Sequence, residues 1–345
     1  MRTLPHPADS AAAEFQIDPP LQGGRDYRSW LGRAGFMLGL FAVLYVGAMF
    51  WLGRASWGSV LGSIVGLREL PLVLGLVAWG VVLRALRFYY FGRRLGWRVP
   101  PLASGVVFVA SFALTATPGK AGELLKSALL RARYGTPVAQ SGGALIVERV
   151  GDLVALLILA SGGLLLFAGL RSYFLVGVVL VAAICVLLRT LAIPCLERAR
   201  RFASSRNLAE RLLRVLRATD ALLRPVPLLV GFGLAVLAWS GEALAFHVLA
   251  LRLPVAVPLL TSFSIFGLSA VAGALSMLPG GLGGVEAVMV LLLNQLGVAV
   301  PEATLTVIIF RFCTIYLTSL LGLCFLGLWR LLPPAGTPSP RSAEA

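Results

Sequence analysis

The chain has few charged side chains for its length. Only 13% of its 345 residues are Asp, Glu, Lys or Arg, whereas 58% are hydrophobic and the mean hydropathy is +0.89. A water-soluble domain carries about twice that share of charge, so this composition excludes one. Several stretches reach about 20 apolar residues, the length that crosses a bilayer core as a helix. We therefore expect an all-α polytopic membrane protein.

Residues that build metal centres and nucleophilic active sites are also scarce. The chain has two histidines, His6 and His247, and four cysteines without paired metal-ligand spacing. It shows no nucleophile with an adjacent base and no Walker-type nucleotide loop. The sequence therefore predicts no enzyme, no metal site and no cofactor, and it predicts cysteines that serve as small apolar filler.

Acidic residues are half as frequent as basic ones. The 15 acids against 30 Lys and Arg give a net charge of +15. In a soluble protein this excess would suggest nucleic acid as a partner. In a membrane protein, Lys and Arg gather on the cytoplasmic side, so we expect no nucleic-acid partner. The meaning of each charge then depends on whether it lies in a loop or within a membrane span.

The middle of the chain contains an internal repeat. Residues 84–104 align without a gap with residues 242–262, an offset of 158, and agree at nine positions. After small insertions the match continues from residues 118–123 to residues 279–286. Two related halves in an apolar chain are typical of transporters built from repeats.

Six segments are apolar over about 18 or more residues and predict membrane spans. They are residues 34–52, 71–92, 138–169, 173–192, 227–250 and 302–330. We expect one transmembrane domain over 34–330, with repeat 1 at about 71–169 and repeat 2 at about 227–330.

The flanks 1–33 and 331–345 are predicted to be disordered, without a cleavable signal peptide. Residues 193–226 predict an amphipathic cytoplasmic linker on the inner leaflet, with a solvated connector as the alternative.

Two further apolar pieces, residues 101–134 and 258–298, are each broken by a Pro-Gly-rich turn. A turn of this kind cannot face lipid, because its freed backbone groups need protein or water partners. We interpret both pieces as re-entrant helical hairpins. The tip residues are Pro118, Gly119 and Gly122 in the first hairpin and Pro279, Gly280, Gly281, Gly283 and Gly284 in the second.

Basic residues predict the orientation of the spans. If each hairpin returns to its own side, the arginines of residues 93–98, 131–133 and 193–226 share the cytoplasmic face, together with both termini. Three crossings then separate the span 71–92 from its copy 227–250, so the copies run in opposite directions. The predicted fold is an inverted-topology repeat with about six full spans plus two re-entrant hairpins.

Charged residues inside the spans occupy repeat-related positions. Each costs on the order of 2.5 to 3.5 kcal/mol at a helix centre and needs a partner or water. Arg84 aligns with Glu242 and Glu148 aligns with Arg311, so the signs are exchanged between the halves. From their predicted depths we expect two ion pairs, Arg84 with Glu148 and Glu242 with Arg311, each lining a polar cavity. Pairs that only hold helices together are the alternative.

The first half also carries a cytoplasmic-side group of basic residues suited to a phosphate-bearing headgroup. In an alternative reading Lys126 only extends to the membrane interface, and Glu123 and Glu286 only satisfy the starts of their own helices. The complete set of candidate substrate-binding residues is Arg84, Arg87, Lys120, Glu123, Lys126, Glu148, Arg149, Asp152, Glu242, Glu286 and Arg311.

Four sequence features together resemble a known family. They are TPGKAGELLKSALLRARYG at 117–135, ERVGD at 148–152, LPGGLGGVEA at 278–287 and the late membrane arginine Arg311. The chain resembles the lysylphosphatidylglycerol synthase transmembrane family, also called the flippase-like domain family, over residues 34–330. The resemblance implies a domain of the bacterial or archaeal cytoplasmic membrane that moves polar lipids between leaflets, with Glu148, Arg149, Asp152 and Arg311 along the lipid path.

Some members of that family carry a soluble domain that aminoacylates phosphatidylglycerol. Only 15 residues follow residue 330, so we expect a stand-alone membrane domain without that activity. The leading hypothesis is a lipid flippase or scramblase whose partners are membrane lipids with anionic or phosphate-bearing headgroups. An intramembrane enzyme acting on lipid phosphates or glycolipids, and a scaffold for a lipid-modifying enzyme, are the alternatives. Association into a homo-oligomer stays open.

Overall fold

The computed structural model describes residues 68–114, 121–162, 171–187, 206–276 and 278–331, together with the single residues 190 and 194. The predicted N-terminal segment 1–33, the span 34–52 and the tail after residue 331 lie outside the described residues. So do Pro118, Gly119 and Lys120. Glu123 lies in a described helix, but its side chain lies outside the description.

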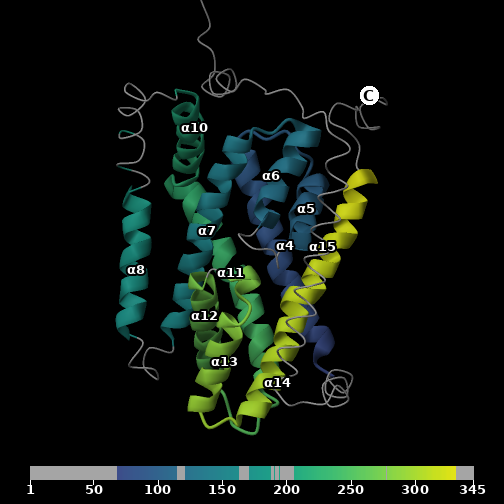
Figure 1. The fold of residues 1–345 in the computed structure, drawn as a ribbon, viewed down its shortest axis with the longest axis vertical. Helices are drawn as coiled ribbons and strands as arrows, with labels where there is room; N and C mark the ends of the chain where they lie inside the picture. The colour runs from purple at the N-terminus through teal and green to yellow at the C-terminus, as the bar shows by residue number, and fades with distance from the viewer. Residues whose placement is uncertain are drawn as a thin grey trace, which may run out of the picture.

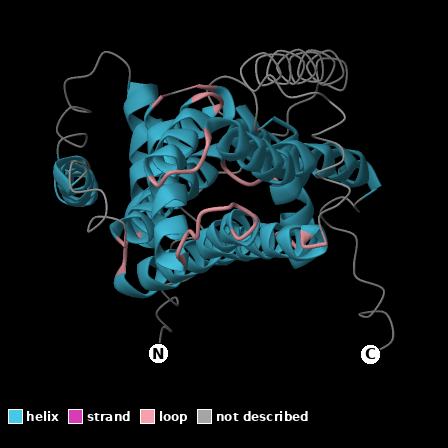
Figure 2. Cartoon of the chain, turned by 90° about the horizontal axis from the view of Figure 1, so that it is seen from below, coloured by secondary structure: helices cyan, strands magenta, loops and turns pink. Residues whose placement is uncertain are grey.

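The described residues form helices and no strands, as Figure 2 shows in a view from below the bundle. This confirms the predicted all-α fold. In chain order the main helices are α4 (Leu70–Arg94), α5 (Pro101–Ala110) continued by η1 (Ser111–Leu114), α6 (Ala121–Tyr134), α7 (Val138–Ser161), α8 (Arg171–Val186), α10 (Arg206–Leu222), α11 (Pro225–Ala250), α12 (Leu259–Leu275), η5 (Pro279–Gly281), α13 (Gly284–Gln295), α14 (Val300–Arg311), η6 (Phe312–Tyr316), α15 (Leu317–Leu328) and η7 (Trp329–Leu331).

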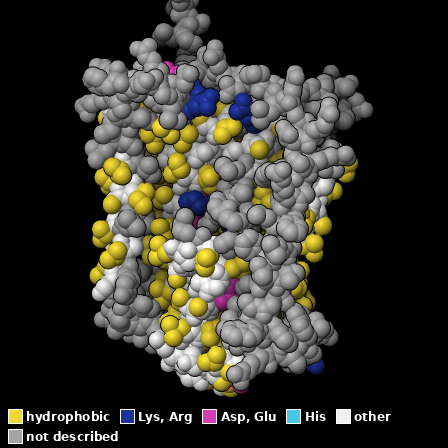
Figure 3. Space-filling model, in the orientation of Figure 1, with side chains coloured by type: hydrophobic (Ala, Val, Ile, Leu, Met, Phe, Trp, Pro, Cys, Tyr) yellow, Lys and Arg dark blue, Asp and Glu magenta, His cyan; other side chains and the backbone are white. Residues whose placement is uncertain are grey.

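Three of these helices are long and apolar enough to cross a membrane. They are α4, α11 and the continuous helix Val300–Leu328 formed by α14, η6 and α15. Each corresponds to a predicted span. The helix α7 begins at the predicted Val138 and has membrane length, but it carries Glu148, Arg149 and Asp152 in its middle. Where the structure describes the side of the molecule facing the viewer in Figure 3, hydrophobic side chains are spread over the surface from the upper to the lower end.

The two halves have the same order of helices. At the repeat offset, the start of α5 at residue 101 corresponds to the start of α12 at residue 259, and the start of α6 at 121 corresponds to that of α13 at 284. In Figure 1 the turn between α6 and α7 lies at the upper end of the molecule, and the turn between α13 and α14 lies at the lower end. The repeat is therefore inverted, as predicted.

Each predicted hairpin contributes two described helices, and residues 115–120, at the predicted tip of the first, lie outside the described residues. The pair α5–α6 lies in the upper half of Figure 1 and the pair α12–α13 lies in the lower half. In the second hairpin the break is at the predicted tip, where Gly280, Gly281 and Gly283 have positive φ angles of 60°, 66° and 84°. Such angles are accessible to glycine at little cost, which explains why this tip is rich in that residue.

The hairpins hold the two halves together, because each packs on the long helix of the other half. Helix α5 with η1 contacts α15, and α12 contacts α7. The backbones approach closely at both contacts. A Cβ atom added to Gly322 of α15 would lie 2.2 Å from the backbone nitrogen of Ala113, and one added to Gly267 of α12 would lie 2.7 Å from that of Ala160. Any larger residue would push these helices apart.

The predicted amphipathic linker contains α10. Its residues Leu213, Ala218 and Leu222 are buried, and Ala218 lies against Gly143 of α7. In Figure 1, α10 stands along the long direction of the bundle at its upper end. Much of the apolar stripe is thus covered by the protein itself, while Arg211 and Arg217 stay exposed. Helix α8 stands at the edge of the bundle beside α7 (Figures 1 and 2).

Candidate functional site

The charged residues predicted inside the spans are mostly buried. Seven of them are at most 8% exposed: Arg87, Lys126, Glu148, Asp152, Glu242, Glu286 and Arg311. Arg84 is partly buried, with a side chain 13% exposed, and the side chain of Arg149 is 41% exposed. Because a buried charge needs a counter-charge or hydrogen bonds, the pairing of these groups shows how the site is built.

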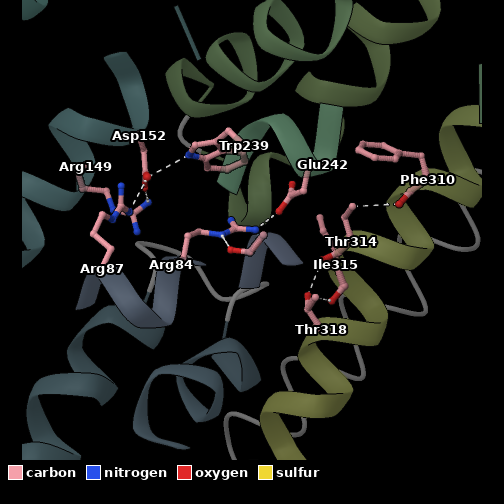
Figure 4. Close-up of polar contacts among 11 residues, drawn as sticks. Arg84, Arg87, Arg149, Asp152, Trp239, Glu242, Phe310, Thr314, Ile315 and Thr318 are labelled. Atoms are coloured by element: carbon pink, nitrogen blue, oxygen red, sulfur yellow. Dashed lines mark hydrogen bonds and ion pairs between the residues drawn. The ribbon is translucent and has the colours of Figure 1, made fainter. Parts of the chain in front are cut away.

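Arg84 and Glu242 form an ion pair where α4 packs against α11. The Nε atom of Arg84 also donates to the carbonyl oxygen of Gly80, one turn earlier in α4, at 3.2 Å. The guanidinium lies 4.7 Å from the ring centre of Trp239, close enough for an attractive cation–π contact. Figure 4 shows Arg84 extending from α4 towards Glu242. The pair therefore joins the first helix of one repeat to the first helix of the other.

Asp152 of α7 gathers three donors around one carboxylate (Figure 4). Its Oδ1 atom accepts hydrogen bonds from Arg87 Nη2 at 2.7 Å and from Trp239 Nε1 at 3.0 Å. Its Oδ2 atom lies 3.4 Å from Nη1 of Arg149. One negative charge is thus shared between two guanidinium groups, and Trp239 connects this cluster to Arg84. The arrangement spans α4, α7 and α11.

Glu148 lies one turn before Asp152 in α7 and pairs with a different helix. Its Oε2 atom accepts from the Nζ atom of Lys126 in α6 at 2.9 Å. The ammonium of Lys126 also lies 4.9 Å and 5.1 Å from the ring centres of Phe88 and Phe108. Since Lys126 is only 4% exposed, it does not extend to the membrane interface, and that alternative reading is wrong. The contact fixes the returning helix of the first hairpin to α7.

The second hairpin is fixed by a corresponding ion pair with the signs exchanged: the acid lies on the returning helix of the hairpin, and the base lies on the helix that follows. Arg311 Nε of α14 donates to Glu286 Oε1 of α13 at 2.5 Å, and Arg311 Nη2 donates to the carbonyl oxygen of Gly280 at 2.8 Å. The other carboxylate oxygen of Glu286 accepts from the backbone N–H of Gly283 at 2.7 Å. Glu286 therefore satisfies the start of its own helix, as the alternative reading predicted, and it also binds Arg311, which was not predicted.

The two predicted ion pairs are wrong. Arg84 binds Glu242 instead of Glu148, and Arg311 binds Glu286 instead of Glu242. The prediction matched charges by depth in the membrane, but depth does not say which helices are neighbours. Arg84 and Glu242 are equivalent positions on two helices that pack against each other, so they meet near the pseudo-two-fold axis. Glu148 and Arg311, also equivalent, each bind the returning helix of their own hairpin.

The structure adds features that the charge pattern did not single out. Trp239 bridges Asp152 and Arg84, and Phe88 and Phe108 line the ammonium of Lys126. Directly after Arg311, the helix passes through the π-helical turn η6 (Phe312–Tyr316). Short π-helical segments within α-helices are frequent at functional sites. The hydroxyls of Thr314 and Thr318 bond backbone carbonyls within the helix, but Thr304 and Thr306 do the same in the regular helix α14, so the sequence carried no signal for this irregularity.

Comparison with known families gives one result. The family described as lysylphosphatidylglycerol synthase TM region matches residues 23–322. The match covers repeat 1, nearly all of repeat 2, both hairpins and every charged pair described above. No curated protein matches the chain.

Proposed function

Because the chain belongs to the lysylphosphatidylglycerol synthase transmembrane family and is thus a multi-pass membrane protein related to lipid handling, we propose that it moves a polar, phosphate-bearing lipid between the two leaflets. It acts as a flippase or scramblase and leaves the lipid chemically unchanged. The headgroup passes through the charged interior while the acyl chains stay in the bilayer.

The observation that carries this proposal is the amount of charge buried inside an apolar helix bundle. Charged side chains inside a membrane protein are costly and usually line a substrate or ion path. Here four acids and at least three basic residues are at most 8% exposed, and they connect α4, α6, α7, α11, α13 and α14. Stable packing alone is served as well by apolar side chains of similar volume.

The arrangement of the hairpins supports a route with alternating access. We propose that both are re-entrant and reach the membrane interior from opposite faces. Inverted repeats supply two related half-sites and two related conformations, each open to one side. The pairs Lys126–Glu148 and Glu286–Arg311 fasten the hairpins, so breaking one pair at a time would release one hairpin at a time.

The positions of the basic residues support an orientation for this machine. The ends of α4 and α6 carry Arg93, Arg94, Arg131 and Arg133, and these ends lie with α10 at the upper end in Figure 1. By the tendency of Lys and Arg to stay inside, we propose that this end is cytoplasmic, with both termini on that side. The membrane would be the cytoplasmic membrane of a bacterium or archaeon.

A reconstitution experiment tests the proposal. Purified protein is placed in liposomes containing a fluorescent phospholipid, and a membrane-impermeant quencher reports the fraction of headgroups that change leaflet. We expect rapid movement with the wild type and slow movement with Arg311→Gln. The matched control is Glu302→Gln, which changes an exposed acid at the start of the same helix.

Mass spectrometry of the recovered lipid separates the other functions. Lipid that is chemically altered instead of moved would indicate that the protein is an enzyme. Lipid that is neither moved nor altered would favour a scaffold for a separate enzyme. Either result would reject the transport proposal.

A further inference from the structure

Two buried charged groups in the first half have hydrogen-bonding atoms that the protein leaves unused. Arg87 is 2% exposed, and among the described residues its Nε and Nη1 atoms have no hydrogen-bond partner. Glu148 is 1% exposed, and its Oε1 atom likewise has none within the described part of the chain. Buried polar atoms are nearly always bonded, so each of these atoms has capacity for a partner that the described residues do not supply.

The two groups have opposite hydrogen-bonding roles, because the guanidinium of Arg87 only donates and the carboxylate of Glu148 only accepts. Arg87 is bound to Asp152, and Asp152 and Glu148 lie four residues apart on one face of α7. This spacing separates Cβ atoms by about 5 to 6 Å. Arg87 is thus held by a residue that lies one helical turn from the acceptor Glu148. A short headgroup alcohol linked to a phosphate can reach both.

Charge indicates which end of the headgroup meets which residue. The carboxylate of Asp152 is shared between Arg87 and Arg149, so the positive charge of Arg87 is only partly balanced. A phosphodiester carries one negative charge on two oxygens and suits an arginine. The free oxygen of Glu148 belongs to a carboxylate, which only accepts hydrogen bonds. It requires an N–H or O–H group.

Gly151 packs closely beside the donor surface of Arg87. A Cβ atom added there would lie 3.5 Å from Nη1 of Arg87 and 3.2 Å from Cδ1 of Phe232. Phe232 of α11 and the unused Nη1 atom of Arg87 thus both lie beside Gly151. In this conformation the unused atoms are closed off, so a headgroup reaches them only if the side chains or helices that cover them move.

We infer that this site binds a phospholipid whose headgroup carries a hydrogen-bond donor, such as the ammonium of phosphatidylethanolamine or the hydroxyls of phosphatidylglycerol. Arg87 binds the phosphate and Glu148 binds the donor. Phosphatidylcholine has the phosphate but no donor, so it satisfies only Arg87. This inference rests on the proposed function for the placing of a lipid in the site, and it specifies the headgroup.

Binding to the purified protein tests the inference independently of transport. Native mass spectrometry compares phosphatidylethanolamine with phosphatidylcholine, which differ only in the methyl groups that remove the donor. We expect the ethanolamine lipid to bind about tenfold more tightly, the ratio expected for one hydrogen bond to a charged group. Equal binding of the two lipids by the wild type would overturn the inference and would indicate that water fills the unused positions.

Paired variants assign the two contacts without leaving a buried charge. Lys126→Met with Glu148→Leu should remove the preference for ethanolamine and keep binding to both lipids. Arg87→Met with Asp152→Asn should weaken both lipids about equally. Arg94→Met, an exposed arginine at the end of α4, is the control and should change neither. A preference that survives the change at Glu148 would also overturn the inference.

Two outcomes distinguish the inference from the proposed function. Selective binding without movement between leaflets would keep the inference and reject transport. Movement of lipid without selective binding would keep the transport proposal and reject the inference.

Soluble glycerophosphoethanolamine shows whether the acyl chains are needed for binding. If it binds with the same selectivity over glycerophosphocholine, the headgroup alone is recognised. If only the lipids bind, the whole lipid is the ligand. The assignment of Arg87 and Glu148 stands in both cases.

Discussion

Arg84 and Glu242 occupy the same position in the two repeats and form an ion pair with each other. This contact is a direct consequence of inversion, because two equivalent helices that pack antiparallel bring equivalent residues together near the axis that relates them. The exchange of sign at this position makes the contact attractive. Two arginines or two glutamates there would repel each other.

The first prediction concerns the energy of this pair. Glu242→Gln alone or Arg84→Gln alone leaves an unbalanced charge in a partly buried place, and each should cost on the order of 2 kcal/mol. The double variant removes both charges and should cost clearly less than the sum. Thermal unfolding of the four proteins in detergent measures the coupling. Additive losses would show that the two residues do not interact.

The second prediction concerns the packing of α4 on α11. A Cβ atom at Gly80 would lie 2.8 Å from the backbone oxygen of Ala238, whereas one at Gly75 on the same helix would meet nothing within 4 Å. Gly80→Ala should therefore lower stability by about 1 to 3 kcal/mol. Gly75→Ala should be neutral or stabilise by up to about 1 kcal/mol, because alanine favours helix. Equal melting temperatures for the two variants would contradict the described helix contact.

The third prediction concerns the tip of the second hairpin. Glu286 binds both Arg311 and the N–H of Gly283, so Glu286→Ala should free the tip as well as the arginine. Hydrogen exchange at residues 280–287 should speed up markedly. Glu302→Ala removes another first-turn acid, which is exposed, and should leave exchange at the tip unchanged. Unaltered exchange in Glu286→Ala would mean that the tip is held by other contacts.

The fourth prediction concerns the inverted topology. Val138 and Val300 start equivalent helices and are 44% and 51% exposed. In a chain whose four native cysteines are replaced by serine, a single cysteine at either position can be labelled by an impermeant maleimide. We expect Val138→Cys to react from the cytoplasmic side and Val300→Cys from the opposite side. Reaction of both from one side would remove the inversion.

Much of the fold follows from patterns that the sequence displays directly. Apolar runs predicted α4, α11 and the helix of α14 and α15, and the repeat offset placed the starts of α5 and α12 in register. The Pro-Gly tip at residues 279–284 predicted the break between α12 and α13, because only glycine takes those backbone angles cheaply. These features depend on local sequence or on comparison of the chain with itself.

The partners of the buried charges depend on which helices are neighbours, and that information is not local. Depth alone could not distinguish Glu148 from Glu242 as the partner of Arg84. Lys126 was ambiguous because a lysine can extend to the interface or pair inside, and the choice depends on Glu148, Phe88 and Phe108 from three other helices. Trp239 gave no sign of its bridging role, since tryptophans in apolar helices are common.

The central claim is that the buried charges move lipid and do not only hold helices together. The most direct test compares two charge-neutral double variants that act on the same two helices. Arg84→Gln with Glu242→Gln removes the buried pair, and Glu69→Gln with Arg252→Gln removes the more exposed pair that joins the start of α4 to the end of α11. The rate of headgroup movement in liposomes should fall about tenfold or more for the first variant, at least about 1.4 kcal/mol in the barrier, and stay near wild type for the second. Equal rates for the two variants, with both proteins folded, would contradict the claim.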